Sequence, residues 1–381
     1  EHQSLPYSLG DSNIYTLGRI GQHNVAIACL PAGRMGISSA ATVASQMKST
    51  FTSMKFGFMV GIGGGVPSKE LDIRLGDVVI SQPDVQHGGV VQYDFGKTGV
   101  GGQFTRTGSL NSPPTVLLNA LAKLRSDYAR GTLKLQEHLD SLARIPEFAY
   151  QGADFDVLYS ASYSHVGEEA CNECSKEEAV TRFPRKNTEP SLRFGLIASG
   201  NQVIKDSVTR DRLSKESGGI LCVEMEAAGL MDSFPCLVIR GICDYADSHK
   251  HKRWQPYAAA TAAACAKELF HVIPPTRIIT VPTINGTAGE SGTWTSQIPK
   301  YLGGLAINLA VLGLGIMFSN GSQHDNQDRA QILESNEPYE DKSNCKFSTS
   351  DFSTCILIRG LNDSYTRYVS VFKNKKGSLG L

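Results

Sequence analysis

The sequence has no excess of charge of either sign, because 37 lysine and arginine residues stand against 37 aspartate and glutamate residues. A chain without net charge has no overall field to gather nucleic acid or an anionic membrane. We therefore predict a small molecule or a protein as the partner, and no nucleic acid. Residues 1–13 lack a charged leader followed by an apolar core, so we expect no secretory signal there. The chain also begins without methionine, and we expect an upstream segment to be missing.

The cysteines do not indicate an oxidising compartment. Five of the nine lie inside apolar runs, where a reduced thiol behaves as a small hydrophobic group. We therefore expect a reducing, cytoplasmic location. These five are Cys29, Cys222, Cys236, Cys243 and Cys265.

Long apolar runs are scarce, and one of them stands apart near the end of the chain. Residues 301–318 carry no charge over 18 positions, which is at the lower limit of about 17 to 25 residues for a membrane span. Four glycines and Asn308 weaken a span, so a buried or partner-binding segment stays open beside membrane contact. We assign residues 276–381 to a linker and irregular tail that contains this segment.

The rest of the chain alternates apolar strands with helical stretches. Residues 14–30 read as a hairpin, and short apolar runs such as 193–199, 220–225 and 236–242 are separated by helical patterns. Apolar strands that alternate with helices predict an α/β fold with a mixed, mainly parallel twisted sheet flanked by helices. We place this domain at 1–275, with a polar surface insertion at 146–190.

Two acidic residues stand where functional groups are expected in such a sheet. Glu226 follows one apolar strand and Asp244 ends the next, and ligands of open parallel sheets bind beyond the carboxyl ends of the strands. Carboxylates at neighbouring strand ends can converge on one ligand. Each residue alone has a structural explanation too, because acidic side chains commonly cap a helix.

A glycine-rich segment and a basic run accompany these acids. GIGGGVPS (61–68) follows a strand and lets backbone amides approach an anion or a flat ring, although it fits neither the dinucleotide nor the phosphate-loop pattern. HKHKR (249–253) lies close after Asp244 and is suited to phosphate oxygens. A solvated loop would explain this run equally simply.

Three residues of the insertion resemble half of a zinc site. They are His165, Cys171 and Cys174. Four ligands are normally needed, and these residues are three. We therefore predict no metal and no cofactor.

The motifs together give a specific resemblance. In order along residues 14–272 they are GIGGGVPS, LGDVVIS, GLIASGNQVIKD, CVEMEAAGL and VIRGICDYAD. This series resembles the nucleoside phosphorylase superfamily, which includes the purine nucleoside phosphorylases and the methylthioadenosine/S-adenosylhomocysteine nucleosidases. The branch it is most similar to is the fungal one found as an N-terminal module of STAND or NLR-type receptors.

The resemblance implies a role for each matching residue. Glu226 would accept hydrogen bonds from the ribose hydroxyls with Met225 beneath the sugar, and Asp244 would be the catalytic acid that protonates the departing purine. The residues implied beside the base are Gly63, Gly64, Val203, Ile204 and Trp254. For a nucleotide substrate, the basic run would offer Lys250, Lys252 and Arg253 to the phosphates.

Two departures from the family pattern shape the predicted reaction. No counterpart of the opening strand, which carries the phosphate loop or the water-activating glutamate, precedes residue 14. Met59 stands where phosphorylases of this type tend to carry a phosphate-binding arginine. We therefore predict release of a purine base from a nucleoside or nucleotide, with hydrolysis favoured over phosphorolysis.

Several alternatives stay open at this level. The substrate could be ATP or a nucleoside, and phosphate could still take part. A module of an immune-type receptor that senses nucleosides or assembles without turnover is the alternative to an enzyme. The resemblance also implies a homo-oligomer, to which Tyr93 and Phe95 could contribute, although both could be ordinary strand aromatics.

Overall fold

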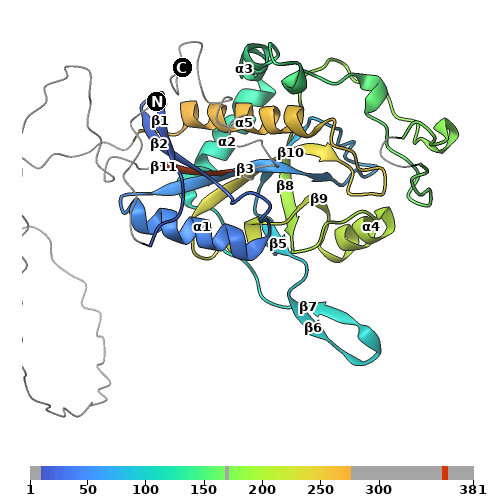
Figure 1. Ribbon diagram of the computed structural model, residues 1–381, viewed down its shortest axis with the longest axis horizontal. Helices are drawn as coiled ribbons and strands as arrows, with labels where there is room; N and C mark the ends of the chain where they lie inside the picture. Colours follow the sequence, from blue (N-terminus) through green and yellow to red (C-terminus); the bar gives the residue numbers. More distant parts are fainter. Residues whose placement is uncertain (1–9, 168–170, 276–353, 359–381) are drawn as a thin grey trace, which may run out of the picture. The chain divides into compact units, whose positions relative to one another are not determined.

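The computed structural model describes residues 10–167, 171–275 and 354–358. Within these residues, nine strands form one mixed sheet in the order β1-β2-β11-β3-β10-β4-β8-β5, and β9 pairs with both β3 and β8 (Figure 1). Helices lie on both faces of this sheet. The predicted α/β class, with a mixed sheet flanked by helices, is confirmed.

The predicted hairpin opens the described chain. It consists of β1 (Thr16–Ile20) and β2 (His23–Cys29), which pair in antiparallel fashion. Gly21 sits at the turn with a φ of 57°, a conformation that glycine adopts without strain. Helix α1 (Ile37–Thr50) follows and buries the small and apolar residues at its helical spacing.

The centre of the sheet is formed by two fully buried strands. They are β3 (Phe56–Gly65) and β10 (Cys236–Asp244), which run parallel to each other. Both come from continuous apolar runs, as expected for strands covered on both faces. Strand β4 (Val78–Ser81) pairs antiparallel with β10, so the direction of the sheet reverses there.

The strands beyond β4 run in the reversed direction. Strand β8 (Leu192–Ser199) is parallel to β4, to β5 (Val90–Gln92) and to β9 (Ile220–Glu224). Consequently β9 is antiparallel to β3, with Val223 opposite Gly64. The sheet is therefore built from two sets of parallel strands of opposite direction.

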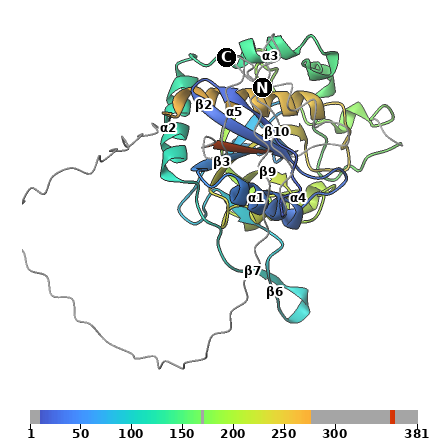
Figure 2. The same ribbon diagram turned by 60° about the vertical axis from the view of Figure 1, so that its left-hand side comes forward.

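The helix that closes the domain packs directly on the central strands. Helix α5 (Gln255–Val272) lies against β10 and β3, and α2 (Thr115–Ala129) and α3 (Leu135–Leu142) pack on α5 (Figure 2). Alanines permit this close approach, and a Cβ atom added to Gly241 of β10 would overlap the backbone of Ala258. On the other face, α1 contacts β2, and α4 (Ser207–Glu216) contacts β9.

Several local elements differ from what residue periodicity alone suggests. Residues 113–145 carry leucines at helical spacing but form two helices, since Gly131 at a φ of 66° interrupts them. The stretch after Glu226 forms only a 3-10 turn, η5 (Ala227–Gly229). Residues 90–97 divide between β5 and β6 (Gly96–Thr98), which pairs with β7 (Phe104–Arg106) in a separate arm. Four further 3-10 turns are Val100–Gly102, Pro146–Phe148, Ala153–Phe155 and Lys176–Glu178.

A strand from the end of the chain enters the sheet. Strand β11 (Thr354–Ile358) lies between β2 and β3 and is parallel to both. The sequence predicted no strand in this region. The apolar run 301–318 lies outside the described residues, and among the described residues no helix is long and apolar enough to cross a membrane.

Candidate active site

Glu226 lies at the turn between β9 and η5 with its side chain fully buried. Its Oε1 accepts a hydrogen bond from the backbone N–H of Gly36, at 3.2 Å. The side chain makes no capping bond to η5, so the helix-cap explanation does not hold for it. Gly36 has a φ of 96°, which favours glycine at this contact.

A buried arginine stands beside Glu226. The guanidinium group of Arg240 in β10 pairs with Glu224, and its Nη2 lies 3.6 Å from Oε2 of Glu226. All three side chains are shielded from solvent. Burial lowers the pKa of Arg240, but the two carboxylates outweigh that effect and raise it above its usual value. Arg240 is therefore a fixed cation that holds both carboxylates in place.

Glu224 in turn organises the backbone that carries Glu226. Its carboxylate accepts hydrogen bonds from the N–H groups of Glu226 and Ala227, each at 3.1 Å. The hydroxyl of Ser199 in β8 accepts from Ala228, at 2.9 Å. This turn is therefore fixed by side chains from β8, β9 and β10.

Asp244 ends β10 and is paired with a cation. Its Oδ1 accepts from the backbone N–H of Ala246 at 2.9 Å and lies 3.1 Å from Nζ of Lys250. Lys250 is partly exposed, with 24% of its side chain accessible, and its ammonium group also donates to the carbonyl oxygen of Ile204 at 3.5 Å. The carboxylate of Asp244 is therefore contacted both by a backbone N–H group and by an ammonium group.

The two strands that lead to the candidate acids adjoin the same residue of β3. Gly64 is opposite Asp244 of β10 on one side and Val223 of β9 on the other. A Cβ atom at Gly64 would lie 2.8 Å from Oδ1 of Asp244. The glycine therefore lets the β10 loop approach β3. The sequence placed the acids at the ends of successive strands, and the structure shows that these strands are joined through the end of β3.

The remaining residues implied by the resemblance differ in their exposure to solvent. Met225 and Ile204 are buried, whereas Val203 is 47% exposed. Gly63 is buried, and a Cβ atom there would clash with Cys222. Trp254 is fully buried, and its indole N–H donates to the carbonyl of Phe155 at 3.1 Å. Trp254 presents no exposed ring face in this structure, and its lining role stays a prediction.

The basic run does not act as one cluster. Lys250 points to Asp244, and Lys252 is exposed. The guanidinium group of Arg253 lies 3.8 Å from the centre of the Phe155 ring, a cation–π contact with the insertion. The sequence did not separate these three roles.

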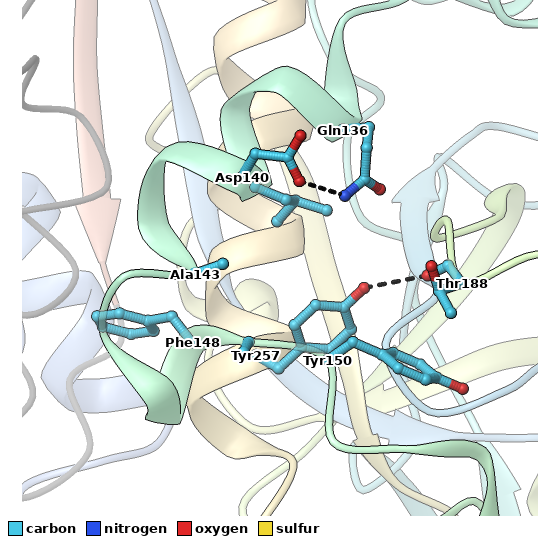
Figure 3. A pocket seen from close by; sticks show the side chains of 9 residues that line it. Gln136, Asp140, Ala143, Phe148, Tyr150, Thr188 and Tyr257 are labelled. Carbon is cyan, nitrogen blue, oxygen red and sulfur yellow. Dashed lines mark hydrogen bonds between the residues drawn. The ribbon is translucent and has the colours of Figure 1, made fainter.

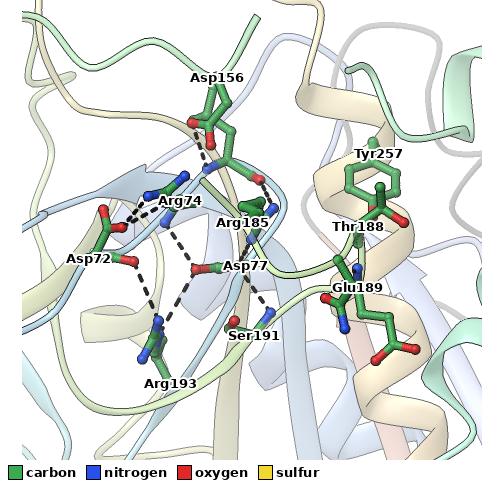
Figure 4. A network of polar contacts seen from close by, with 12 residues as sticks. Asp72, Arg74, Asp77, Asp156, Arg185, Thr188, Glu189, Ser191, Arg193 and Tyr257 are labelled. Carbon is green, nitrogen blue, oxygen red and sulfur yellow. Dashed lines mark hydrogen bonds and ion pairs between the residues drawn. The ribbon is translucent and has the colours of Figure 1, made fainter. Parts of the chain in front are cut away.

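The insertion is attached to the strand that carries Asp244. Asp77, just before β4, is buried among backbone N–H groups and Arg185, which pairs with its carboxylate (Figure 4). Burial raises the pKa of Asp77 despite this arginine. The backbone carbonyl of Asp77 accepts from Ile242 at 2.8 Å, two residues before Asp244. Arg182 adds a bond to the hydroxyl of Tyr245, at 2.8 Å.

A small pocket lies elsewhere, between α3, the insertion and α5 (Figure 3). Tyr150 and Tyr257 line it, with ring centres 5.6 Å apart, and the Tyr257 hydroxyl donates to the carbonyl of Thr188 at 3.3 Å. No candidate residue for the reaction lines this pocket. We therefore place the candidate active site at the carboxylates of Glu226 and Asp244 and not at this pocket.

The insertion also brings together the residues of the half zinc site. The ligand atoms of His165, Cys171 and Cys174 lie within 4.8 Å of one another. Burial and the neighbouring thiol of Cys174 raise the pKa of Cys171 to about 12, so this thiol is not an activated nucleophile.

Sequence reasoning missed two contacts of the candidate acids. Arg240 is a charge inside an apolar strand, and this interruption of CLVIRGIC was a usable signal, because a buried charge requires partners. The pairing of Lys250 with Asp244 had no signal in the sequence, since it depends on how the loop after β10 folds back.

Comparisons with known proteins agree with this fold. The family model of the phosphorylase superfamily matches residues 4–273, and the chain belongs to this superfamily. The chain is 50% identical over 267 residues to a nucleotide-binding leucine-rich repeat (NLR)-like protein of Hyaloscypha variabilis, a match that covers 70% of this chain and 26% of that protein. It therefore spans about a quarter of that relative's length.

Two further comparisons concern nucleosidases. A 5'-methylthioadenosine/S-adenosylhomocysteine nucleosidase of Mycobacterium tuberculosis is 34% identical over 91 residues, which cover 23% of this chain and 35% of that enzyme. The crystal structure of such a nucleosidase from Neisseria meningitidis, in complex with methylthio-immucillin-A, is 17% identical with a TM-score of 0.45. That match covers 70% of this chain and 88% of the other.

Proposed function

We propose that this protein cleaves the N-ribosidic bond of a purine nucleoside or nucleotide and releases the base. The observation that carries the proposal is that Asp244 and strand β9 both adjoin Gly64, and that Glu226 follows β9 by two residues. Membership of the phosphorylase superfamily supports it. In this proposal one acid serves the sugar and the other serves the base.

Each acid has a distinct task in this reaction. Breaking the bond builds positive charge on the sugar, which the carboxylate of Glu226 stabilises while it accepts hydrogen bonds from the ribose hydroxyls. Negative charge accumulates on the departing purine, and Asp244 relieves it by donating a proton. Arg240 is a positioning residue, because it touches the carboxylates and not the reacting atoms.

Glu226 is fully buried, so a ribose reaches it only after a local movement. The covering group is Gly36, whose N–H bonds to Oε1, and residues 31–35 before it are exposed. Displacement of this short segment would open the path to the carboxylate. Met225, which is next to Glu226, would then pack against the sugar.

Hydrolysis is the proposed reaction in preference to phosphorolysis. Met59 is fully buried in β3 and offers no cation to a phosphate nucleophile. Lys250 is the cation closest to the candidate acid and suits a substrate phosphate, which would draw the ammonium group away from Asp244. This arrangement favours a nucleotide such as ATP over a nucleoside.

Separation of free base from nucleotide by chromatography tests the proposal. We expect the full chain to release adenine from ATP or adenosine without added phosphate, and the amount to be unchanged when phosphate is supplied. Strict dependence on phosphate would replace hydrolysis by phosphorolysis. No base from ATP, adenosine or methylthioadenosine would contradict an enzyme.

A second function is favoured by one specific observation. The NLR-like relative shares half of its matched residues with this chain and is about four times as long as the matched part. A module that binds a nucleoside or nucleotide and transmits occupancy without turnover would fit that context. Binding of adenosine or ATP measured by calorimetry, without release of base, would select this function.

We also propose that residues 1–275 with β11 form the catalytic domain and that the domain assembles as a homo-oligomer. Phe95 is 58% exposed and adjoins the β6-β7 arm, where Phe104 is 47% exposed, whereas Tyr93 is buried with its hydroxyl on the carbonyl of Gln202. Exposed aromatics on a projecting arm are typical of contacts between subunits. Light scattering measures the molar mass of the full chain and of Phe95→Ser. A monomer in both proteins would refute the homo-oligomer.

A further inference from the structure

The insertion contains a compact set of metal-binding side chains. The ligand atoms of His165, Cys171 and Cys174 lie within 4.8 Å of one another, and the two cysteines are separated by two residues. In tetrahedral zinc sites, bond lengths of about 2.0 to 2.3 Å place ligand atoms about 3.3 to 3.8 Å apart. The three groups therefore need to close in by only about one ångström.

The fold adds a fourth residue that is distant in the sequence. His249, in the loop after β10, is 8% exposed, and neither of its ring nitrogens has a hydrogen-bond partner among the described residues. Its ring centre lies 5.6 Å from that of His165, and its carbonyl oxygen accepts from the thiol of Cys171 at 3.9 Å.

A buried imidazole without partners is costly, because every tautomer carries a polar N–H. Coordination by one ring nitrogen would satisfy half of this requirement. Nδ1 of His249 lies 3.9 Å from Oδ1 of Asp247, so a small shift would let the other nitrogen donate to that carboxylate. Metal-bound histidines are usually oriented by such a carboxylate.

We propose that His165, Cys171, Cys174 and His249 bind one zinc ion. Two thiolates and two imidazoles in tetrahedral geometry are the donor set that selects zinc among the common divalent cations. The sequence supplied three of these ligands within one segment. The fourth became visible only when the β10 loop was placed against the insertion.

The ion would fasten the insertion to the loop of the candidate active site. His165 already donates its backbone N–H to the hydroxyl of Ser248 at 3.0 Å, and the Tyr159–Ala179 bridge closes the base of the insertion. Between these points the insertion offers little apolar burial. A structural zinc ion supplies folding free energy where a hydrophobic core is small. The loop that it fixes carries Asp244 and Lys250.

The metal content of the purified full chain tests the proposal. After zinc is offered together with a competing chelator, mass spectrometry of the metal should find about one zinc ion per chain. The double variant Cys171→Ser/Cys174→Ser should hold less than about a tenth of that amount. His271→Asn is the matched control, because His271 belongs to the other described group of suitable ligands, with His138 and Glu268, and this variant should keep its zinc.

Cobalt in place of zinc gives a spectroscopic readout of the ligands around the ion. The wild-type chain should show thiolate-to-cobalt charge-transfer bands and the visible bands of a tetrahedral ion, and His249→Ala should lose the tetrahedral bands. An unchanged spectrum in His249→Ala overturns its assignment. No bound metal in the wild type, equal zinc in the double variant, or a Cys171–Cys174 disulfide as the resting form overturns the site.

Discussion

The ammonium nitrogen of Lys250 lies 3.1 Å from Oδ1 of Asp244. In the proposed reaction, Asp244 is the proton donor and Lys250 is the residue suited to a substrate phosphate. Because one ammonium group cannot serve both anions at full strength, binding of a phosphate would release Asp244. In the proposed reaction, the pair would therefore link binding of a nucleotide to the chemical step.

Lys250→Met should reduce cleavage of ATP more than cleavage of adenosine. Loss of a hydrogen bond to a charged group costs about 1.5 to 3 kcal/mol, so kcat/KM for ATP should fall about 10-fold to 150-fold. Initial rates of adenine release with each substrate measure this. Lys69→Met, a substitution at an exposed lysine, is the control and should leave the ratio of the two rates unchanged. Equal losses for both substrates would contradict a phosphate contact.

Asp244→Asn should abolish most of the turnover without unfolding the protein. An amide cannot donate an acidic proton, and general acid catalysis contributes about 10²-fold to 10⁴-fold. Single-turnover measurements of base release give the rate of the chemical step, and urea unfolding provides the control for folding. Full turnover in this variant would remove Asp244 from its catalytic role.

Glu226→Gln should weaken cleavage of ribonucleosides more than cleavage of 2'-deoxyribonucleosides. The carboxylate accepts hydrogen bonds from the sugar hydroxyls, and a charged acceptor is roughly twice as strong as a neutral one. The comparison of kcat/KM for adenosine and 2'-deoxyadenosine reports this contact. If the variant lowers both values by the same factor, Glu226 does not contact the hydroxyl that the deoxy substrate lacks.

Arg240→Met should destabilise the fold strongly. It leaves the carboxylates of Glu224 and Glu226 buried without their cation, and removal of one partner of a buried ion pair costs about 3 to 5 kcal/mol. Urea unfolding of the full chain measures the loss. Arg240→Met/Glu224→Gln should recover part of it, because one uncompensated charge is removed. A loss below about 1 kcal/mol in the single variant would mean that water reaches these carboxylates.

His23 should make the fold sensitive to mild acid. Burial lowers the pKa of His23 below its usual value of 6.5, and its Nε2 lies 3.0 Å from the carbonyl oxygen of Ile273. Below pH 6.5 the unfolded chain takes up a proton that the folded chain does not, so stability is present above 6.5 and is lost as pH falls through the lowered pKa.

The melting temperature should be measured between about pH 5 and pH 7.5, around the ordinary histidine pKa. As the pH falls, it should decrease more steeply in the wild type than in His23→Gln. Glutamine keeps a donor for the Ile273 carbonyl and does not titrate. Identical slopes in the two proteins would assign the acid sensitivity to other groups.

The sequence determined most of the strands and helices, because their signals are local. The hairpin turn at Gly21 and the buried run of β3 were predictable from residue type and periodicity alone. Glu226 and Asp244 could also be singled out as candidate acids, since the first follows an apolar strand, the second ends one, and both stand in recognisable motifs. These features depend on neighbours within a few positions along the chain.

The tertiary structure alone decided which distant groups meet. Strand β11 enters between β2 and β3 from about 300 residues away, and no local pattern fixes such a pairing. Trp254 had the residue type of a base-lining aromatic, but packing against the insertion buried it. Lys250 contacts Asp244, and the carbonyl of His249 accepts from the thiol of Cys171, because of the course that the loop after β10 takes. Charge pairing and coordination act through space, so they become visible only after the backbone has brought these residues together.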